Sequence, residues 1–236
     1  MQTPQVSAHT PPFDPTRPLV ADALLPQYWH HRLSAIQQLA CVEPLQLSVD
    51  RFLFLRHGQT HGNLTKVFQP ADIPLNDNGL AQASRAAAML RGIRIDDIFA
   101  SPMMRARQTA EAVARVVGIE PVAEPRLSER WFGDLVGSSS VDLDWSFDPP
   151  NGESLADFVA RVRDGVQARV NPQPEREKLL VAHGGVLYAL AFSLRAAIEP
   201  AFIENATPLR FERTHGTWAI TPLGLNESRL GTASGV

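Results

Sequence analysis

Two segments of the chain place a histidine and a glycine directly after a short apolar run. Arg56-His57-Gly58 follows Phe52–Leu55, and His183-Gly184-Gly185 follows Leu179–Ala182. Runs this short, bounded by glycine, are typical of buried strands rather than helices. In open α/β sheets, ligands bind in the loops just past the carboxyl ends of the strands. We therefore expect both histidines to lie at a ligand site.

A third predicted strand, Ile95–Ala100, is followed by Ser101-Pro102 and then by Arg105. If the three strands are neighbours, two guanidinium groups and two imidazoles converge, from Arg56, Arg105, His57 and His183. Such a cluster suits a phosphate dianion, because the planar fork of arginine matches phosphate oxygens. Gly184 and Gly185 precede a predicted helix, whose free N–H groups would add affinity for an anion.

The remaining elements alternate between helices and strands, which favours an α/β fold with a mostly parallel sheet covered on both faces. We expect a three-layer α/β/α sandwich. The pattern predicts helices at 27–40, 79–91, 103–117, after Ser154, and at 186–197, a short strand within 121–125, and a terminal hairpin of 209–212 and 217–221.

The predicted domain covers residues 50–230. Residues 1–49 form an N-terminal extension, with a flexible proline-rich arm over Met1–Pro18 and one helix. That helix is expected to pack on the core, with capping of an active-site mouth as the alternative. Residues 231–236 are expected to be a flexible tail.

The composition restricts the function classes. The chain has 236 residues, a formal net charge of −3 and 44% hydrophobic residues. A slightly acidic chain carries no electrostatic signature of nucleic-acid or membrane binding. The single cysteine, Cys41, excludes an internal disulfide and a cysteine zinc site. No apolar run reaches membrane-spanning length, and the first residues do not resemble a signal peptide, so we expect a cytoplasmic protein.

An ordered series of motifs resembles the histidine phosphatase (phosphoglycerate mutase-like) superfamily. The resemblance covers roughly residues 51–230, and the joint order of the motifs is more specific than any one of them. The motifs are Leu55-Arg56-His57-Gly58-Gln59-Thr60 with Asn63, Pro74-Leu75-Asn76 with Gly79, Ser101–Ala110, Leu127-Ser128-Glu129 with Gly133 and Gly137, Asn151–Ser154, and Ala182–Gly185.

The resemblance implies a phosphoglycerate mutase-like fold and a role for each site residue. His57 would be the nucleophile that forms a phosphohistidine, and Glu129 would be the general acid and base. Arg56, Arg105 and His183 would bind the phosphoryl oxygens, with Asn63, Gln69 and Gly184 as further phosphate contacts. It implies neither a metal nor a cofactor. Pro70 departs from the family pattern, where a glycine commonly supplies a backbone N–H.

Several candidate residues also have an ordinary structural interpretation. A histidine after a buried strand is as often a hydrogen-bonded structural residue as a functional one. Glu129 could be a solvated loop carboxylate, and Arg107 is expected to pair with Glu111 along its helix. The other histidines are interpreted as non-catalytic, although His61 lies close to the motif: His9, His30, His31, His61 and His215.

Two activities are compatible with the motifs. A cofactor-dependent (2,3-bisphosphoglycerate) phosphoglycerate mutase must retain a bisphosphorylated acid, which demands extra cations, but residues 131–160 contain no lysine or arginine. That interval instead carries Asp134, Asp142, Asp144, Asp148, Glu153 and Asp157 together with aromatic residues. We therefore expect a phosphomonoester hydrolase whose leaving group is apolar, sugar-like or cationic. A non-catalytic regulatory binding protein on the same fold is the alternative from another class.

The expected partner is a small phosphorylated metabolite, and inorganic phosphate or sulfate should bind at the same cluster. A homodimer is compatible with the sequence, which does not decide the oligomeric state. Neither nucleic acid nor membrane is expected as a partner.

Overall fold

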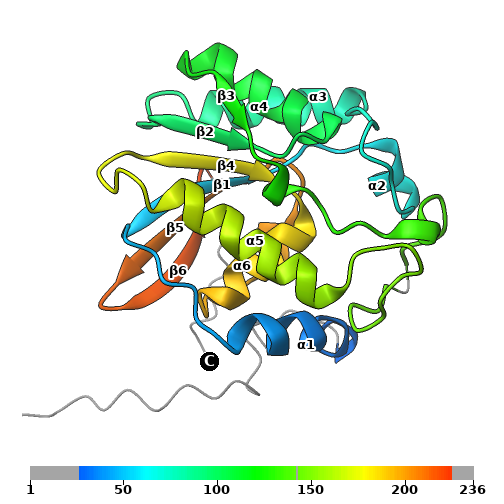
Figure 1. Ribbon diagram of the computed structural model, residues 1–236. Coiled ribbons are helices and arrows are strands. Elements are labelled where there is room, and N and C mark those ends of the chain that lie inside the picture. Colours follow the sequence, from blue (N-terminus) through cyan, green and yellow to red (C-terminus); the bar gives the residue numbers. More distant parts are fainter. Residues whose placement is uncertain (1–26, 142, 225–236) are drawn as a thin grey trace, which may run out of the picture.

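The computed structural model describes residues 27–141 and 143–224, which form one six-stranded sheet flanked by helices (Figure 1). The strand order is β3-β2-β4-β1-β5-β6. The first four strands in this order are parallel, and β5 and β6 add an antiparallel edge. The strands are β1 (Arg51–Arg56), β2 (Asp97–Ala100), β3 (Pro121–Ala123), β4 (Lys178–Ala182), β5 (Pro208–Thr214) and β6 (Thr217–Pro222).

Helices cover both faces of the sheet, so the predicted three-layer α/β/α architecture is confirmed (Figure 1). Alternate side chains of β1 serve the two layers, as the period of two in a strand requires. Phe52 and Phe54 join the core beneath α1 (Gln27–Cys41), α5 (Leu155–Val170) and α6 (Gly184–Ser193). Leu53 and Leu55 join the core beneath α3 (Asp77–Met89) and α4 (Met104–Val117).

The helix ends follow local capping chemistry. The side chains of Asn76 and Ser154 accept hydrogen bonds from backbone N–H groups at the starts of α3 and α5. Gly118 ends α4 in the left-handed conformation, which glycine adopts without strain. These ends agree with the predicted helices to within two residues.

The prediction for α6 was wrong at its C-terminal end, which comes four residues earlier than expected. The helix begins at Gly184 and ends at Ser193, whereas the sequence suggested 186–197. His183 is the N-cap residue and has an extended backbone, so Gly184 and Gly185 form the first turn of the helix. Side chains of the site pack closely against both glycines. A short helix, α2 (His61–Thr65), and three 3₁₀ turns at Pro125–Leu127, Gly133–Leu135 and Pro200–Ile203 were not predicted.

Helix α1 packs on the core, as the sequence indicated. Its buried residues Leu33, Ile36, Ala40 and Cys41 recur at helical spacing and join the same core cluster as α5 and α6. The proline-rich arm and the tail predicted at 231–236 lie outside the described residues. Within the part of the chain that the structure describes, no helix is both long and apolar enough to span a bilayer.

Candidate active site

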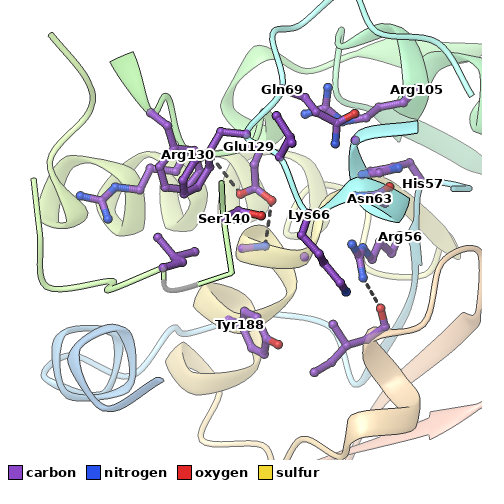
Figure 2. A pocket seen from close by; sticks show the side chains of 18 of the residues that line it. Arg56, His57, Asn63, Lys66, Gln69, Arg105, Glu129, Arg130, Ser140 and Tyr188 are labelled. Carbon is purple, nitrogen blue, oxygen red and sulfur yellow. Dashed lines mark hydrogen bonds between the residues drawn. The ribbon is translucent and has the colours of Figure 1, made fainter. Parts of the chain in front are cut away.

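The three strands that carry the predicted site are neighbours in the sheet. β4 lies between β1 and β2, and Arg56 pairs with Ala182 while Ala100 pairs with Val181. The carboxyl ends of β1 and β4 therefore deliver Arg56, His57 and His183 to one point, and Arg105 reaches it from the first turn of α4. We call Arg56, His57, Arg105 and His183 the basic cluster; Figure 2 shows Arg56, His57 and Arg105 around one cavity.

His57 is buried, and its surroundings hold it neutral. Burial lowers its pKa well below the ordinary value of 6.5, and the charges of Arg105 and Arg56 lower it further. Nδ1 lies 2.7 Å from the carbonyl oxygen of Gly58, which can only accept, so Nδ1–H donates. The lone pair of the neutral ring is then on Nε2. The ring centroid lies 5.1 Å from that of His183.

Two glycines let the loop after β1 approach α3. A Cβ on Gly58 would lie 2.5 Å from the carbonyl oxygen of Gly79, and one on Gly79 would lie 2.0 Å from that of Gln59. The N–H of Gly58 donates to the hydroxyl of Thr109 on α4 at 3.0 Å. This packing fixes the backbone next to His57, and Asn205 adds a hydrogen bond to the His57 carbonyl at 2.9 Å.

Each arginine of the cluster donates from its Nη groups, whereas its Nε has no partner among the described residues. Arg56 donates to the carbonyl of Ile203, and Arg105 donates to the carbonyl of Pro70 at 2.9 Å. The buried Nε groups of Arg56 and Arg105 have no hydrogen-bond partner among the described residues. Buried cationic donors without acceptors are costly, and an anion would satisfy them. Pro70, which departs from the family pattern, thus contributes its carbonyl to the site.

His183 adds a third donor of the same kind. Its Nε2 lies 2.8 Å from the hydroxyl of Ser101, and its buried Nδ1 has no partner among the described residues. Burial lowers the pKa of His183 well below 6.5, with further contributions from Arg105, His57 and Arg56. The ring is therefore neutral in the free protein.

Asn63 and Gln69 both line the cavity. Asn63 completes a capping box with Thr60 at the start of α2, and its Oδ1 accepts from the Thr60 N–H at 3.1 Å. Its amide group is thereby held with the Oδ1 end toward the loop. Gln69 lies near Arg105 (Figure 2), and its buried Oε1 has no partner among the described residues.

Glu129 faces the cavity and accepts two backbone hydrogen bonds. Oε2 accepts from Gly185 N–H at 2.9 Å and Oε1 from Arg130 N–H at 3.0 Å. The expectation that the amide of Gly185 is free for a bound phosphate is therefore wrong, because it holds the carboxylate of the chain itself. A Cβ on Gly185 would lie 2.2 Å from Glu129 Oε1, so a larger residue would displace this carboxylate. Gly184 lies beside Arg56 at the edge of the cavity.

Two arginines, Arg130 and Arg161, fix the loop that carries Glu129. Arg161 donates to the carbonyls of Arg126 and Ser128 and pairs with Glu153 at 2.7 Å. The wholly buried guanidinium of Arg130 donates to the carbonyls of Glu153, Trp145 and Phe147 and to Asp148. Their partners are mainly distant carbonyls, which leave no signature in the sequence.

The cavity has a volume of about 410 Å³ and two unlike sides. Arg56, His57, Arg105 and Glu129 line one side, and Lys66, a further residue missed from the sequence, lines it as well. Apolar side chains line the other side: Leu33, Leu143, Trp145, Tyr188 and Ile203. A second cavity of about 380 Å³ lies next to it and shares Phe68, Phe132 and Leu143 with it.

The remaining predicted residues lie away from the cavity or are paired. His61 is exposed and does not line it. Arg107 pairs with Glu111 at 3.5 Å, as predicted. Among the described residues, no three histidine, cysteine, aspartate or glutamate side chains are grouped so that they could hold a metal ion.

Comparison with known proteins places this site in a family. Residues 52–226 match the family described as histidine phosphatase superfamily (branch 1). The chain is 34% identical over 169 residues to the 2,3-bisphosphoglycerate-dependent phosphoglycerate mutase of Azorhizobium caulinodans, covering 62% of this chain and 82% of that protein. It is 29% identical over 185 residues to the uncharacterized phosphatase PhoE of Bacillus subtilis, covering 75% and 95%.

Solved structures show the same relationship. Mycobacterial glucosyl-3-phosphoglycerate phosphatase, in a complex with VO3, superposes with a TM-score of 0.64 at 29% identity, over 75% of this chain and all of that one. The fold, the ordered motifs and the length of the match all indicate the same family. The chain belongs to the histidine phosphatase superfamily, branch 1.

Proposed function

We propose that the protein hydrolyses a phosphomonoester through a phosphohistidine intermediate on His57. The observation that carries this proposal is the basic cluster itself. A neutral, buried imidazole lies among three buried nitrogens without partners in the described chain, on Arg56, Arg105 and His183. This set of donors matches the oxygens of a phosphoryl group held in front of a nucleophile.

In the first step, Nε2 of His57 attacks phosphorus in line with the ester oxygen. A new N–P bond forms as the P–O bond to the leaving group breaks, and protonated Glu129 donates a proton to the departing oxygen. Arg56 and Arg105 offset the charge that shifts to the equatorial oxygens, and the Nδ1–H of His183 donates to one of them. Ser101 supports this tautomer by donating its hydroxyl hydrogen to Nε2 of His183.

In the second step, the carboxylate of Glu129 takes a proton from water, whose oxygen attacks the phosphorus of the phosphohistidine. The N–P bond breaks, inorganic phosphate leaves, and His57 and protonated Glu129 are restored. The two backbone hydrogen bonds from Gly185 and Arg130 keep the carboxyl group in one orientation for both steps.

The relatives include both mutases and phosphatases, and the cations of this cavity favour the phosphatase. A mutase must hold a second phosphate and a carboxylate next to the first phosphate. Arg56 and Arg105 serve the transferred group, and the guanidinium of Arg130 is taken up by three carbonyls and Asp148. Among the described lining residues, Lys66 is the one other cation, and it is exposed.

The deciding experiment is a phosphate-release screen with purified protein over aryl and alkyl phosphates, both phosphoglycerates and fructose 2,6-bisphosphate. A parallel assay follows interconversion of 2- and 3-phosphoglycerate in the presence of 2,3-bisphosphoglycerate. We expect phosphate release that His57→Ala abolishes. Interconversion faster than release would establish the mutase instead. No turnover of any ester, or a trace activity that His57→Ala leaves unchanged, would favour a non-catalytic binding protein.

A further inference from the structure

Helix α1 contributes to the active-site cavity although it precedes the part of the chain that matches the family. The match begins at residue 52, and α1 ends at Cys41. Leu33 on this helix is nevertheless one of the residues that line the cavity. The N-terminal extension thus adds a surface to a site whose chemistry lies in the matched residues.

Leu33 belongs to a continuous apolar surface on the side of the cavity formed by α1 and α6. We call Leu33, Leu143, Trp145, Tyr188 and Ile203 the leaving-group wall. The rings of Trp145 and Tyr188 pack edge to face, with centroids 6.3 Å apart, and Tyr188 stacks on Phe192 at 6.2 Å. Leu33, Trp145 and Tyr188 are buried in the hydrophobic core cluster, so the wall is continuous with the core.

The helix that carries Leu33 is fixed to the domain. The thiol of Cys41 contacts the carbonyl oxygen of Phe192 at 3.3 Å, and the N–H of Leu45 donates to the carbonyl of Ser193 at 2.8 Å. Further along, the Ser48 N–H donates to the side chain of Asn171 at the end of α5 at 2.9 Å. Because both α5 and α6 hold this segment, Leu33 occupies a defined place in the wall.

The leaving-group wall has no charged side chain that could pair with a charged leaving group. Carboxylates of the acidic interval are engaged elsewhere: Asp148 with Arg130, Glu153 with Arg161, and Asp134 with Asn151. The wall itself has no carboxylate to attract a cationic group, since the one carboxylate among the described lining residues, Glu129, is not part of it. An anionic group would lose its hydration against Leu33, Trp145 and Tyr188, whereas an apolar group gains free energy by leaving water.

We propose that α1 completes a subsite that selects phosphomonoesters of apolar, ring-sized alcohols or phenols. This inference rests on the proposed hydrolase function and adds the substrate class. The cavity of about 410 Å³ is within the range of small-molecule sites and has room for a ring next to the phosphoryl group. The hydroxyl of Tyr188 is the main polar group of the wall, and it can hydrogen-bond one oxygen of such a leaving group.

The test compares two pairs of substrates in the full-length protein. Phenyl and 1-naphthyl phosphate differ in size but have similar leaving-group reactivity, and benzyl phosphate and 3-phosphoglycerate are both alkyl esters that differ in charge. We expect the wild-type protein to prefer the apolar member of the second pair by at least about tenfold in kcat/KM. Leu33→Ala should reduce kcat/KM for benzyl phosphate by about tenfold and leave 3-phosphoglycerate within about twofold.

A second variant distinguishes a change in the leaving-group wall from a general loss of packing. Leu33→Phe fills space in the wall and should lower the ratio of 1-naphthyl to phenyl phosphate by about fivefold. Ile36→Ala is the matched control, because Ile36 is buried on the same helix but does not line the cavity. It should lower the midpoint of thermal unfolding without changing either substrate ratio.

Two results would overturn the inference while leaving the hydrolase intact: unchanged ratios in both Leu33 variants, or the same loss of selectivity in Ile36→Ala. A wild-type preference for 3-phosphoglycerate would also contradict it. If the wild-type protein releases phosphate from none of the four esters, the hydrolase proposal fails and the substrate class fails with it.

Discussion

The leaving-group wall and three residues of the basic cluster (Arg56, His57 and Arg105) line the same cavity, but the two regions are built in different ways. The residues of the cluster lie at the ends of β1 and β4 and in the first turn of α4, and three of them carry a buried nitrogen without a partner among the described residues. The five residues of the wall come from α1, the loop before α5, α6 and a 3₁₀ turn, and they continue the hydrophobic core. In the proposed hydrolase, the chemistry would depend on residues at the strand ends, and the choice of leaving group would depend on segments packed onto the sheet.

The largest effect is expected at the nucleophile. His57→Ala should reduce kcat by at least about 10⁴-fold on every ester, because no other group in the cluster can accept the phosphoryl group. Brief incubation of the wild-type protein with ³²P-labelled substrate should give acid-labile protein-bound label that the variant lacks. The control is His61→Ala, which changes an exposed histidine outside the cavity. Equal activity of His57→Ala and wild type would remove the basic cluster from the chemistry.

A smaller effect is expected at Glu129, where the two sides of the cavity meet. Glu129→Gln should lower kcat by about 10²- to 10⁴-fold for benzyl phosphate, because the leaving alkoxide then lacks its proton donor. The loss should be smaller for p-nitrophenyl phosphate, whose leaving group needs little protonation. Label should also accumulate on His57, because hydrolysis of the phosphohistidine needs the same carboxylate. Equal losses for both esters, without accumulated label, would assign Glu129 a structural role.

The two buried histidines should make stability depend on pH. The pKa values of His57 and His183 lie well below 6.5 in the folded protein, so below pH 6.5 the unfolded chain binds more protons than the folded one. The free energy of unfolding should therefore fall as the pH decreases from 7.5 to 5.5, by up to about 1.4 kcal/mol per pH unit for each histidine.

Urea unfolding in phosphate-free buffer at several pH values measures this dependence. His183→Asn should flatten it, and the matched control His215→Asn, in the exposed turn of the hairpin, should not. Added phosphate should restore stability at the lower pH, because a dianion in the basic cluster favours the charged imidazoles. A stability independent of pH over this range would contradict the burial of neutral rings at the strand ends.

The smallest effect is expected at Lys66, on the exposed rim between the two regions. Lys66→Gln should change kcat/KM for phenyl phosphate by no more than about threefold, because water and salt screen an exposed charge. For 3-phosphoglycerate the loss should be larger and should disappear at high ionic strength. A tenfold loss for phenyl phosphate would show that Lys66 acts on the phosphoryl group and belongs with the basic cluster.

Much of this molecule was predictable from short-range patterns. Apolar runs bounded by glycine gave the three central strands, and the motifs after them gave Arg56, His57, Arg105 and His183. These predictions succeed because a strand end delivers its next residues to one edge of the sheet whatever the rest of the chain does. The local pattern could not show that Glu129, 56 residues earlier, accepts a hydrogen bond from the N–H of Gly185.

The wall and the supports of Glu129 could not be predicted in this way. Arg130 and Arg161 bind mainly backbone carbonyls of distant segments, and Leu33 is one of many leucines in helical spacing. The sequence by itself determined that Arg56, His57 and His183 meet at one edge of the sheet, because those residues are tied to the ends of neighbouring strands. Only the tertiary structure decided which apolar side chains line the cavity. Apolar side chains pack against many kinds of partner, so their contacts depend on which helix surfaces meet.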